Sequence, residues 1–350
     1  MAEPKRVYQV WKGNNKFFFG GRLMFGPDVG SLTVTLILIL APVVIFCALV
    51  ARNLLHEFPS RNAGYAILLL VIIFTIYVLL LLILTSGRDP GIVPRSPYPP
   101  DELLGYESPA SVEVGGELPQ NLRFPRFKEV FVNGLPVRVK YCDTCMVYRP
   151  PRCSHCSVCD NCVERFDHHC PWVGQCIGKR NYRSFFLFIS SSALLCIIVF
   201  SMSALHLKLL ADDYGTAWKA MKQSPASVAL MTYCFVLLWF IGGLTCFHVY
   251  LMCSNQTTYE NFRRRMDSRI NAYDRGCKNN LLEILCRKTE PSRIKLRSYI
   301  HLEVANSPPC RAEKNSLIED RRAKVEEDLD IGNDLLKISQ RRASVELSGQ

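Results

Sequence analysis

Long stretches of this 350-residue chain carry no charge of either sign. Asp, Glu, Lys and Arg are all absent from four runs, at residues 31–50, 64–84, 184–207 and 227–252. Each run is close to the roughly 20 apolar residues that a helix needs to cross a bilayer. One such run alone could be a buried core helix. Four together exclude an ordinary soluble domain and predict four transmembrane helices.

The first run also lacks the features of a cleaved signal peptide. It starts only at Ser31, is long, and has no small-residue cleavage site before the next charged segment. We therefore count it as a span, which places the two ends of the chain on the same side of the membrane.

Basic residues are scarce in two of the connections between runs. Only Arg52 and Arg61 lie between the first two runs, and only Lys208, Lys219 and Lys222 between the last two. The other 37 of the 42 Lys and Arg lie elsewhere, so the positive-inside rule predicts that both termini and the middle loop are cytosolic. The net charge of +11 then indicates a basic face toward an anionic leaflet, and no nucleic acid is expected as a partner.

Cysteine, in contrast, is concentrated. Eight of the 16 cysteines and three of the seven histidines fall within residues 142–176. Because a cytosolic location disfavours disulfides, this cluster is expected to bind metal, to react, or both.

One spacing occurs twice in the cluster: a C-x2-C pair, then a histidine after nine residues and a cysteine after six more. The first copy is Cys142, Cys145, His155 and Cys162, and the second, fourteen residues later, is Cys156, Cys159, His169 and Cys176. Three thiolates and one imidazole suit the tetrahedral preference of Zn2+, so two closed structural zinc sites are predicted. A RING-type ligase domain is disfavoured because a final C-x2-C pair is missing.

Three residues of ligand type remain: Cys153, Cys170 and His168. Cys153 has no acid–base partner beside it and is interpreted as a free thiol. Cys170 follows Asp167 and His168, so a thiol, a base and an orienting carboxylate lie together, the arrangement of an activated nucleophile. Its position close before the third run, with Trp172 after it, favours chemistry at the membrane face. The substrates indicated are a fatty acyl thioester and a membrane-proximal thiol.

The segment from Tyr141 to Tyr182 closely resembles the Cys-rich domain of the DHHC-type protein S-acyltransferases. Asp89-Pro90-Gly91 is similar to the DPG motif of that family, and Thr257-Thr258-Tyr259-Glu260 to its TTxE motif. The stretch from Asn271 to Gly276, with Asn279 and Asn280, resembles a C-terminal motif of many members. The resemblance covers roughly residues 7 to 290, and the first ninety residues resemble the plant branch.

The resemblance implies a two-step palmitoyl transfer with two structural Zn2+ ions. Cys170 would attack palmitoyl-CoA or a similar acyl-CoA, with His168 as base and Asp167 orienting it, and pass the acyl group to cysteines of membrane-associated proteins. Trp172 would line the mouth of an acyl cavity between the helices, and Thr258 would pack near the active site. Arg149 and Arg152 could hold the CoA phosphates or be ordinary solvated charges.

We therefore predict an all-α polytopic membrane protein with a cytosolic zinc-binding domain. Its expected parts are an N-terminal segment (1–30), two spans (31–84), a cytosolic loop (85–183) holding the Cys-rich domain (141–182), two further spans (184–252), membrane-proximal motifs (253–306) and a disordered charged tail (307–350). The plasma membrane or the Golgi and endomembranes are the expected locations.

Two other interpretations compete with an enzyme. A zinc-stabilised membrane adaptor would keep the fold without catalysis, but it would need none of Asp167, His168 and Cys170. A regulatory role centred on the tail would use Arg341-Arg342-Ala343-Ser344, which resembles a phosphorylation site. Such short motifs often arise by chance, so the enzyme is the leading hypothesis.

Overall fold

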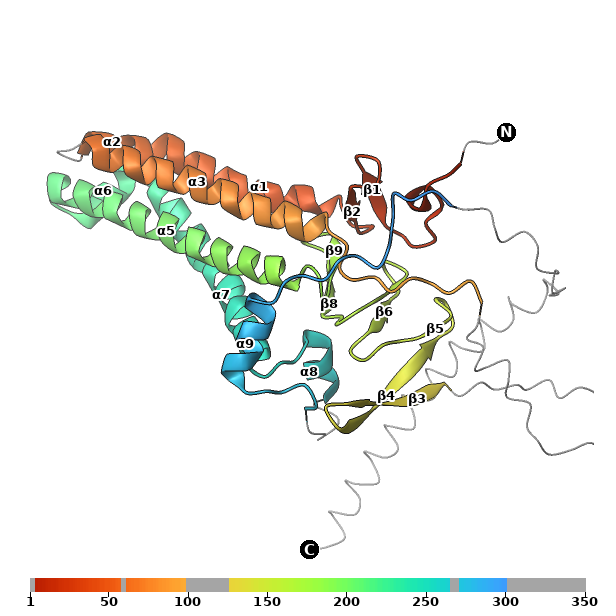
Figure 1. Cartoon of the computed structure of the whole chain (residues 1–350). Helices are drawn as coiled ribbons and strands as arrows, with labels where there is room; N and C mark the ends of the chain where they lie inside the picture. Colours follow the sequence, from red (N-terminus) through yellow and green to blue (C-terminus); the bar gives the residue numbers. More distant parts are fainter. Residues whose placement is uncertain (1–3, 58–60, 99–125, 265–270, 301–350) are drawn as a thin grey trace, which may run out of the picture. The chain divides into compact units, whose positions relative to one another are not determined.

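In a computed structural model of the chain, the structure describes residues 4–57, 61–98, 126–264 and 271–300 (Figure 1). Contacts divide the chain into two compact units, Met1–Ile300 and His301–Gln350. The predicted tail at 307–350 lies outside the described residues, and so does the 99–125 part of the middle loop.

Among the described residues, four helices are long and apolar enough to cross a membrane, and they coincide with the four uncharged runs. They cover Ser31–Leu55, Gly64–Ser86, Tyr182–Tyr214 and Pro225–Cys253. The first combines α1 (Ser31–Ile45), a π-helical turn (Phe46–Ala51) and most of α2 (Arg52–Glu57); the second lies in α3 (Arg61–Ser86). The other two are α5 (Tyr182–Tyr214) and α7 (Pro225–Cys253), joined through α6 (Ala217–Gln223). A helix satisfies its own backbone hydrogen bonds, as hydrocarbon surroundings require.

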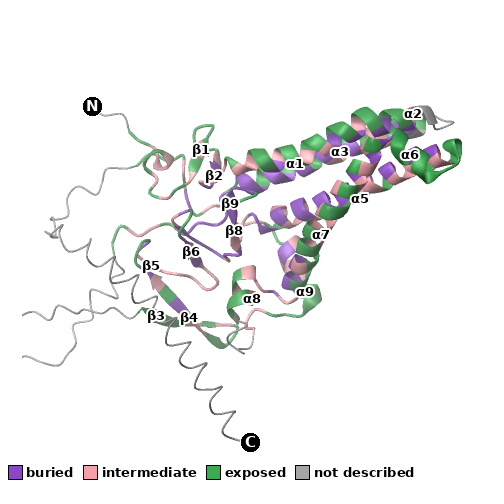
Figure 2. Cartoon of the chain, turned by 180° about the vertical axis from the view of Figure 1, so that it is seen from behind, coloured by how far each residue is buried: buried purple, intermediate pink, exposed green. Residues whose placement is uncertain are grey.

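Helix α5 holds the helices together by packing against both α3 and α7. Its buried side chains, among them Phe185 and Val199, form a core with residues such as Phe46 and Val78. Large apolar side chains remain exposed on the outer faces (Figure 2), including Ile73 and Trp239, which is 72% exposed. Outer faces of this kind suit contact with lipid.

Pro42 interrupts the hydrogen bonding of α1. Proline has no N–H to donate, so the carbonyl of Leu38, one turn earlier, loses its helical partner. The hydroxyl of Tyr233 in α7 donates to that oxygen at 2.7 Å. The replacement hydrogen bond ties α1 to α7 beside a cavity described below.

The two histidines of the apolar helices both face inward and are almost fully buried. His206 Nδ1 lies 2.9 Å from the hydroxyl of Ser227, and His248 Nδ1 lies 2.9 Å from the hydroxyl of Tyr182. The sequence left their orientation open. Each imidazole has a polar partner, as burial requires.

The all-α prediction is wrong for the part of the chain outside the long helices, which contains short antiparallel strands. They are β1 (Lys16–Phe18) with β2 (Leu23–Phe25), β3 (Phe127–Val132) with β4 (Leu135–Cys142) and β5 (Val147–Tyr148), β6 (Ser154–Cys156) with β7 (Asn161–Val163), and β8 (His168–Cys170) with β9 (Gln175–Ile177). Most are two or three residues long, too short for alternating hydrophobicity to reveal.

The segments before α1 and after α7 pack on this Cys-rich region. Asp89 anchors the chain after α3, because its Oδ1 accepts hydrogen bonds from the amides of Gly91 and Ile92 and its Oδ2 lies 2.8 Å from Arg180 Nη1. The chain after α9 (Cys277–Leu285) crosses toward the N-terminal hairpin (Figure 1). There the amides of Val7 and Tyr8 donate to the carbonyls of Ser298 and Leu296.

Candidate active site and metal centres

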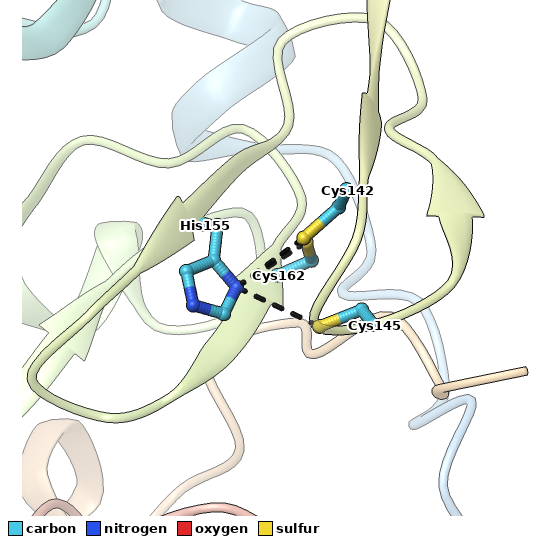
Figure 3. Close-up of side chains that lie close together, drawn as sticks. All are labelled: Cys142, Cys145, His155 and Cys162. Atoms are coloured by element: carbon cyan, nitrogen blue, oxygen red, sulfur yellow. Dashed lines mark hydrogen bonds between the residues drawn. The ribbon is translucent and has the colours of Figure 1, made fainter. Parts of the chain in front are cut away.

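The first ligand set, predicted from spacing, converges in the structure (Figure 3). Cys142 ends β4 and Cys145 lies in the following turn, while His155 and Cys162 stand opposite each other on β6 and β7. His155 Nδ1 lies 3.6 Å from both Cys142 Sγ and Cys145 Sγ and 3.7 Å from Cys162 Sγ. All four ligand atoms fall within 4.8 Å of one another.

The second ligand set repeats this geometry one hairpin later. His169 and Cys176 stand opposite each other on β8 and β9. His169 Nδ1 lies 3.8, 3.4 and 3.5 Å from the sulfurs of Cys156, Cys159 and Cys176.

Both sets fit a tetrahedral zinc ion. Metal–sulfur bonds of about 2.3 Å and metal–nitrogen bonds of about 2.0–2.1 Å give sulfur–nitrogen edges of about 3.6 Å in a tetrahedron. The observed separations of 3.4–3.8 Å bracket that value. In each set the outer nitrogen of the histidine faces a carboxylate: His155 Nε2 lies 3.4 Å from Asp160 Oδ1, and His169 Nε2 lies 2.9 Å from Asp28 Oδ2. Such partners fix the ring orientation of metal-binding histidines.

The two sets share the hairpin formed by β6 and β7. Successive side chains of a strand point to opposite faces, so His155 serves the first set and the adjacent Cys156 serves the second. The hairpin contributes His155 and Cys162 to one set and Cys156 and Cys159 to the other. The two centres are therefore mechanically linked.

A fourteen-residue repeat extends beyond the two ligand sets and includes Cys170. The pairs His155↔Cys162 and Cys156↔Asn161 of the β6–β7 hairpin correspond, fourteen residues on, to His169↔Cys176 and Cys170↔Gln175. The residues with positive φ in the turns keep the same spacing: Met146, Asp160 and Gly174. Cys170 thus occupies the position of a metal-binding cysteine, but Val173 stands where the second sulfur of its C-x2-C pair would be.

Successive residues of β8 face opposite sides, so His169 of the second ligand set points away from His168 and Cys170. Because His169 points to the second ligand set, His168 and Cys170 point together to the opposite face, toward the helices. There the His168 ring packs edge-on against Phe185, with centroids 5.3 Å apart. Cys170 is only 8% exposed. The structure thus brings the predicted thiol and base to one surface.

Asp167 binds His168 on the side away from Cys170. Its Oδ2 lies 2.6 Å from His168 Nδ1, which leaves Nε2 for the thiol. Burial alone would lower the pKa of His168, but hydrogen bonds to Asp167 and Cys170 raise it to about 9. Burial alone would raise the pKa of Asp167, but the contact with His168 and the Thr258 amide hold it below its usual value.

Thr258 holds the carboxylate from its other side, at the start of α8 (Thr258–Arg264). Its amide donates to Asp167 Oδ1 at 2.9 Å and its hydroxyl to Oδ2 at 2.8 Å. A buried carboxylate that accepts three hydrogen bonds stays charged and fixed in place. Thr258, expected near the active site, thus contacts Asp167, which in turn contacts His168.

The two arginines proposed for CoA phosphates differ in their surroundings. Arg152 forms a two-point ion pair with Glu260, at 2.8 Å from Nε to Oε1 and 2.7 Å from Nη2 to Oε2. It also donates to Asn255 and stacks over the ring of Tyr273. Arg149 lies beside Cys142 of the first ligand set, whose thiolate raises the arginine pKa against the effect of burial.

An apolar cavity of about 480 Å³ opens from Cys170 between the helices. Its lining runs along α5 from Phe185 to Val199, about 21 Å at 1.5 Å per residue. Trp172 lies in the lining beside Cys170, and its carbonyl accepts a hydrogen bond from the Thr35 hydroxyl of α1 at 2.7 Å. The volume is within the range of small-molecule sites, roughly 300–1,000 Å³, and the depth exceeds half the hydrocarbon core of a bilayer, about 15 Å.

Three functional neighbours escaped the sequence analysis. Tyr182 and His248 form a hydrogen-bonded pair behind His168. The ring centroids of His168 and His248 lie 6.1 Å apart. Glu260 was noted only as part of a motif. An inward histidine on an apolar helix was a signal for His248, but its partner depends on how α5 and α7 pack.

Comparison with known proteins gives a consistent assignment. The family model described as DHHC palmitoyltransferase matches residues 137–265. Over 345 residues the chain is 59% identical to Protein S-acyltransferase 8 of Arabidopsis thaliana, an alignment that covers 96% of this chain and 84% of the relative. It is 54% identical over 346 residues to Probable protein S-acyltransferase 9 of the same plant, covering 96% and 82%. It is 51% identical over 329 residues to Probable protein S-acyltransferase 7, covering 93% and 73%.

Proposed function

The chain belongs to the DHHC palmitoyltransferase family and is a protein S-acyltransferase, and we propose that it works through an acyl-enzyme formed on Cys170. The donor is palmitoyl-CoA or another long-chain acyl-CoA, and the acceptors are cysteine thiols of membrane-associated proteins. One observation carries the proposal: Cys170 lies where the Asp167–His168 pair meets the apolar cavity.

In the first step His168 takes the proton from the Cys170 thiol, and the sulfur attacks the thioester carbonyl carbon of acyl-CoA. The carbon–sulfur bond to CoA breaks, and the leaving sulfur takes the proton from His168. In the second step His168 removes the proton of an incoming protein thiol, whose sulfur attacks the thioester carbonyl of the acyl-enzyme. The carbon–sulfur bond to Cys170 breaks, and the Cys170 sulfur takes the proton from His168. The raised pKa of His168 favours the imidazolium, and with it the thiolate form of Cys170 after the proton has moved.

Asp167 and Thr258 support this cycle without touching the substrate. Asp167 holds the proton-bearing Nδ1 of His168 and stabilises the imidazolium that forms. Thr258 keeps the carboxylate in position through two hydrogen bonds. In this proposal the cavity holds the acyl chain, with Trp172 at its mouth.

For the CoA phosphates we propose Arg149 and Arg152, since guanidinium matches phosphate geometry. Arg149 is the stronger candidate because Arg152 already holds Glu260. A phosphate contact at Arg152 would have to share that ion pair.

We propose that two Zn2+ ions fill the two ligand sets as structural metals. Four protein ligands per ion leave no open coordination position for substrate. The ions would stiffen the β8–β9 hairpin, which carries a ligand on one face and His168 and Cys170 on the other. The Cys-rich domain at 141–182 would then be a metal-stiffened platform for the nucleophile.

The proposed topology places both termini and the loop at 85–183 in the cytosol, with spans at 31–84 and 184–252 and membrane-proximal motifs at 253–306. It is supported by the distribution of Lys and Arg and by the four apolar helices. The plasma membrane or the Golgi and endomembranes are the proposed locations, where acyl-CoA and membrane-bound acceptors meet.

The test is intact-mass analysis of purified protein after incubation with palmitoyl-CoA. The wild type should gain one acyl group that hydroxylamine removes, and Cys170→Ser should gain none while keeping two zinc ions. Cys153→Ser is the matched control, since Cys153 is also outside the ligand sets, and it should label like the wild type. An unlabelled wild type with two zincs would favour the adaptor, and label on Cys170→Ser would place the nucleophile elsewhere.

A further inference from the structure

A second, polar groove lies at the end of α3 that adjoins the Cys-rich region. It has a volume of about 860 Å³ and is lined by Arg180 and by three separate segments: Gly21–Met24 of the N-terminal hairpin, the α3 end from Ile83 to Asp89, and Ser292–Ser298 after α9. It is distinct from the acyl cavity, with which it shares no lining residue.

Cations dominate the charged side chains of the groove. Five line it, Arg22, Arg88, Arg180, Lys295 and Arg297, against the single acid Asp89. Asp89 is already paired with Arg180. Within the described ranges, the other four cations make no side-chain hydrogen bond or ion pair.

Unpaired cations gathered on one groove repel one another. Burial and the charge of Arg180 lower the pKa of Arg88, and the opposing effect of Asp89 does not offset them. Elsewhere on the same surface, nearby cations are neutralised: Arg293 pairs with Glu164, and Lys179 with Glu164 and Glu290. Four charges left without acids in one place indicate an anionic partner.

The groove is held by specific contacts. The amide of Met24 donates to the carbonyl of Gly87 at 2.9 Å, which joins the hairpin to the end of α3. The amide of Ser298 donates to the carbonyl of Lys295 at 3.0 Å, closing the turn that carries Arg297. Buried Ile294 anchors the same segment in the core beside Met24.

Apolar residues border the groove on the side of α3. Ile83 and Leu84 belong to the last turns of an apolar helix and are 43% and 54% exposed. In the proposed topology this is the cytosolic level of the bilayer, where hydrocarbon gives way to headgroups. A ligand that fits must be polyanionic at one end and apolar at the other.

We propose that this groove binds a phosphoinositide of the cytosolic leaflet. Its phosphorylated headgroup would lie among Arg22, Arg88, Lys295 and Arg297, and its acyl chains would follow Ile83 and Leu84. Basic pockets beside membrane helices on the cytosolic side bind such headgroups. A headgroup with one net negative charge would leave most of these cations without a partner, whereas several phosphates match their number.

The test is native mass spectrometry of the full chain in detergent with phosphatidylinositol 4,5-bisphosphate. The wild type should bind one lipid. The double variant Arg22→Gln with Arg297→Gln should raise the Kd roughly thirtyfold, because each substitution removes the contribution of about one surface cation to binding. The matched control is Arg126→Gln with Arg138→Gln, which removes two exposed cations of the β3–β4 region and should stay within about threefold of the wild type.

Two results would overturn the proposal. One is an equal loss of binding in both double variants, which would mean diffuse attraction by net charge. The other is displacement of the lipid by phosphatidylserine at matched total charge. Zinc content and acyl labelling, measured on the same samples, show whether the variants are folded and separate this proposal from the proposed function. If the double variant loses zinc, Arg297→Gln alone provides the measurement, with about a fivefold effect expected.

Discussion

Replacing Glu260 by glutamine should destabilise the protein through one buried ion pair. Arg152 and Glu260 meet at two points, and their side chains are 8% and 15% exposed. Glutamine keeps the shape of glutamate but can offer Arg152 only one oxygen, and its NH2 group faces a donor. Arg152 is then a buried, half-paired cation.

The magnitude follows from those contacts. Losing one hydrogen bond to a charged group costs about 1.5–3 kcal/mol, and breaking a buried pair outright costs about 3–5 kcal/mol. Glu260→Gln should therefore cost about 2–3 kcal/mol and, for a chain of this length, lower the Tm by roughly 3–4 °C. Because α8 also carries Thr258, which holds Asp167, the rate of acyl-enzyme formation should fall as well.

The assay is thermal unfolding of the detergent-solubilised protein beside the rate of Cys170 labelling. Glu290→Gln is the matched control, since its partner Lys179 is a third exposed and such pairs contribute about 0–1 kcal/mol. Melting and labelling rates of Glu260→Gln within error of the wild type would refute the assignment of the pair as a structural link.

Three further changes test other parts of the molecule. Thr258→Val removes the 2.8 Å hydrogen bond to Asp167 and should slow acyl-enzyme formation roughly tenfold, with Thr258→Ser restoring most of the rate; an unchanged rate in the valine variant would mean that Asp167 is held by other groups. Cys162→Ala should lower the zinc content measured by metal analysis below two per chain and reduce the Tm, whereas retention of two zincs would contradict the ligand assignment. Cys196→Phe places a large ring in the cavity lining and should shift competition between acyl-CoA donors toward shorter chains, and an unaltered preference would mean that the chain lies elsewhere.

The long helices were predictable because their signal is local. An uncharged run of about twenty residues has few alternatives in a folded protein, so four such runs were enough. The strands were not predictable, since β6 to β9 are each three residues long and carry residues of the two candidate ligand sets in place of an alternating apolar pattern. Spacing reveals a ligand set, but it does not reveal that a hairpin holds it.

The candidate site likewise has one part that could be predicted from the sequence and one part that could not. Asp167, His168 and Cys170 are neighbours in sequence, so their meeting could be expected before any fold was known. The partners of this cluster lie far away in sequence: Thr258 contacts Asp167 across 91 positions, and Arg152 contacts Glu260 across 108. The family resemblance placed Thr258 near the site, but the individual contacts depend on how α8 docks on the Cys-rich region.

The repeated hairpins suggest how a reactive thiol arises in a metal-binding scaffold. Where a turn carries two sulfurs, both are available to a metal ion. In the third hairpin Val173 replaces the second sulfur, so Cys170 keeps the backbone placement of a ligand and lacks the companion that would help to capture an ion. Cys170 is the single ligand-type residue that the third copy of the spacing keeps, since Val173, Arg183 and Ser190 stand at its other three positions. In the proposed mechanism, an incomplete copy of a binding motif supplies the nucleophile, already positioned by the complete copies beside it.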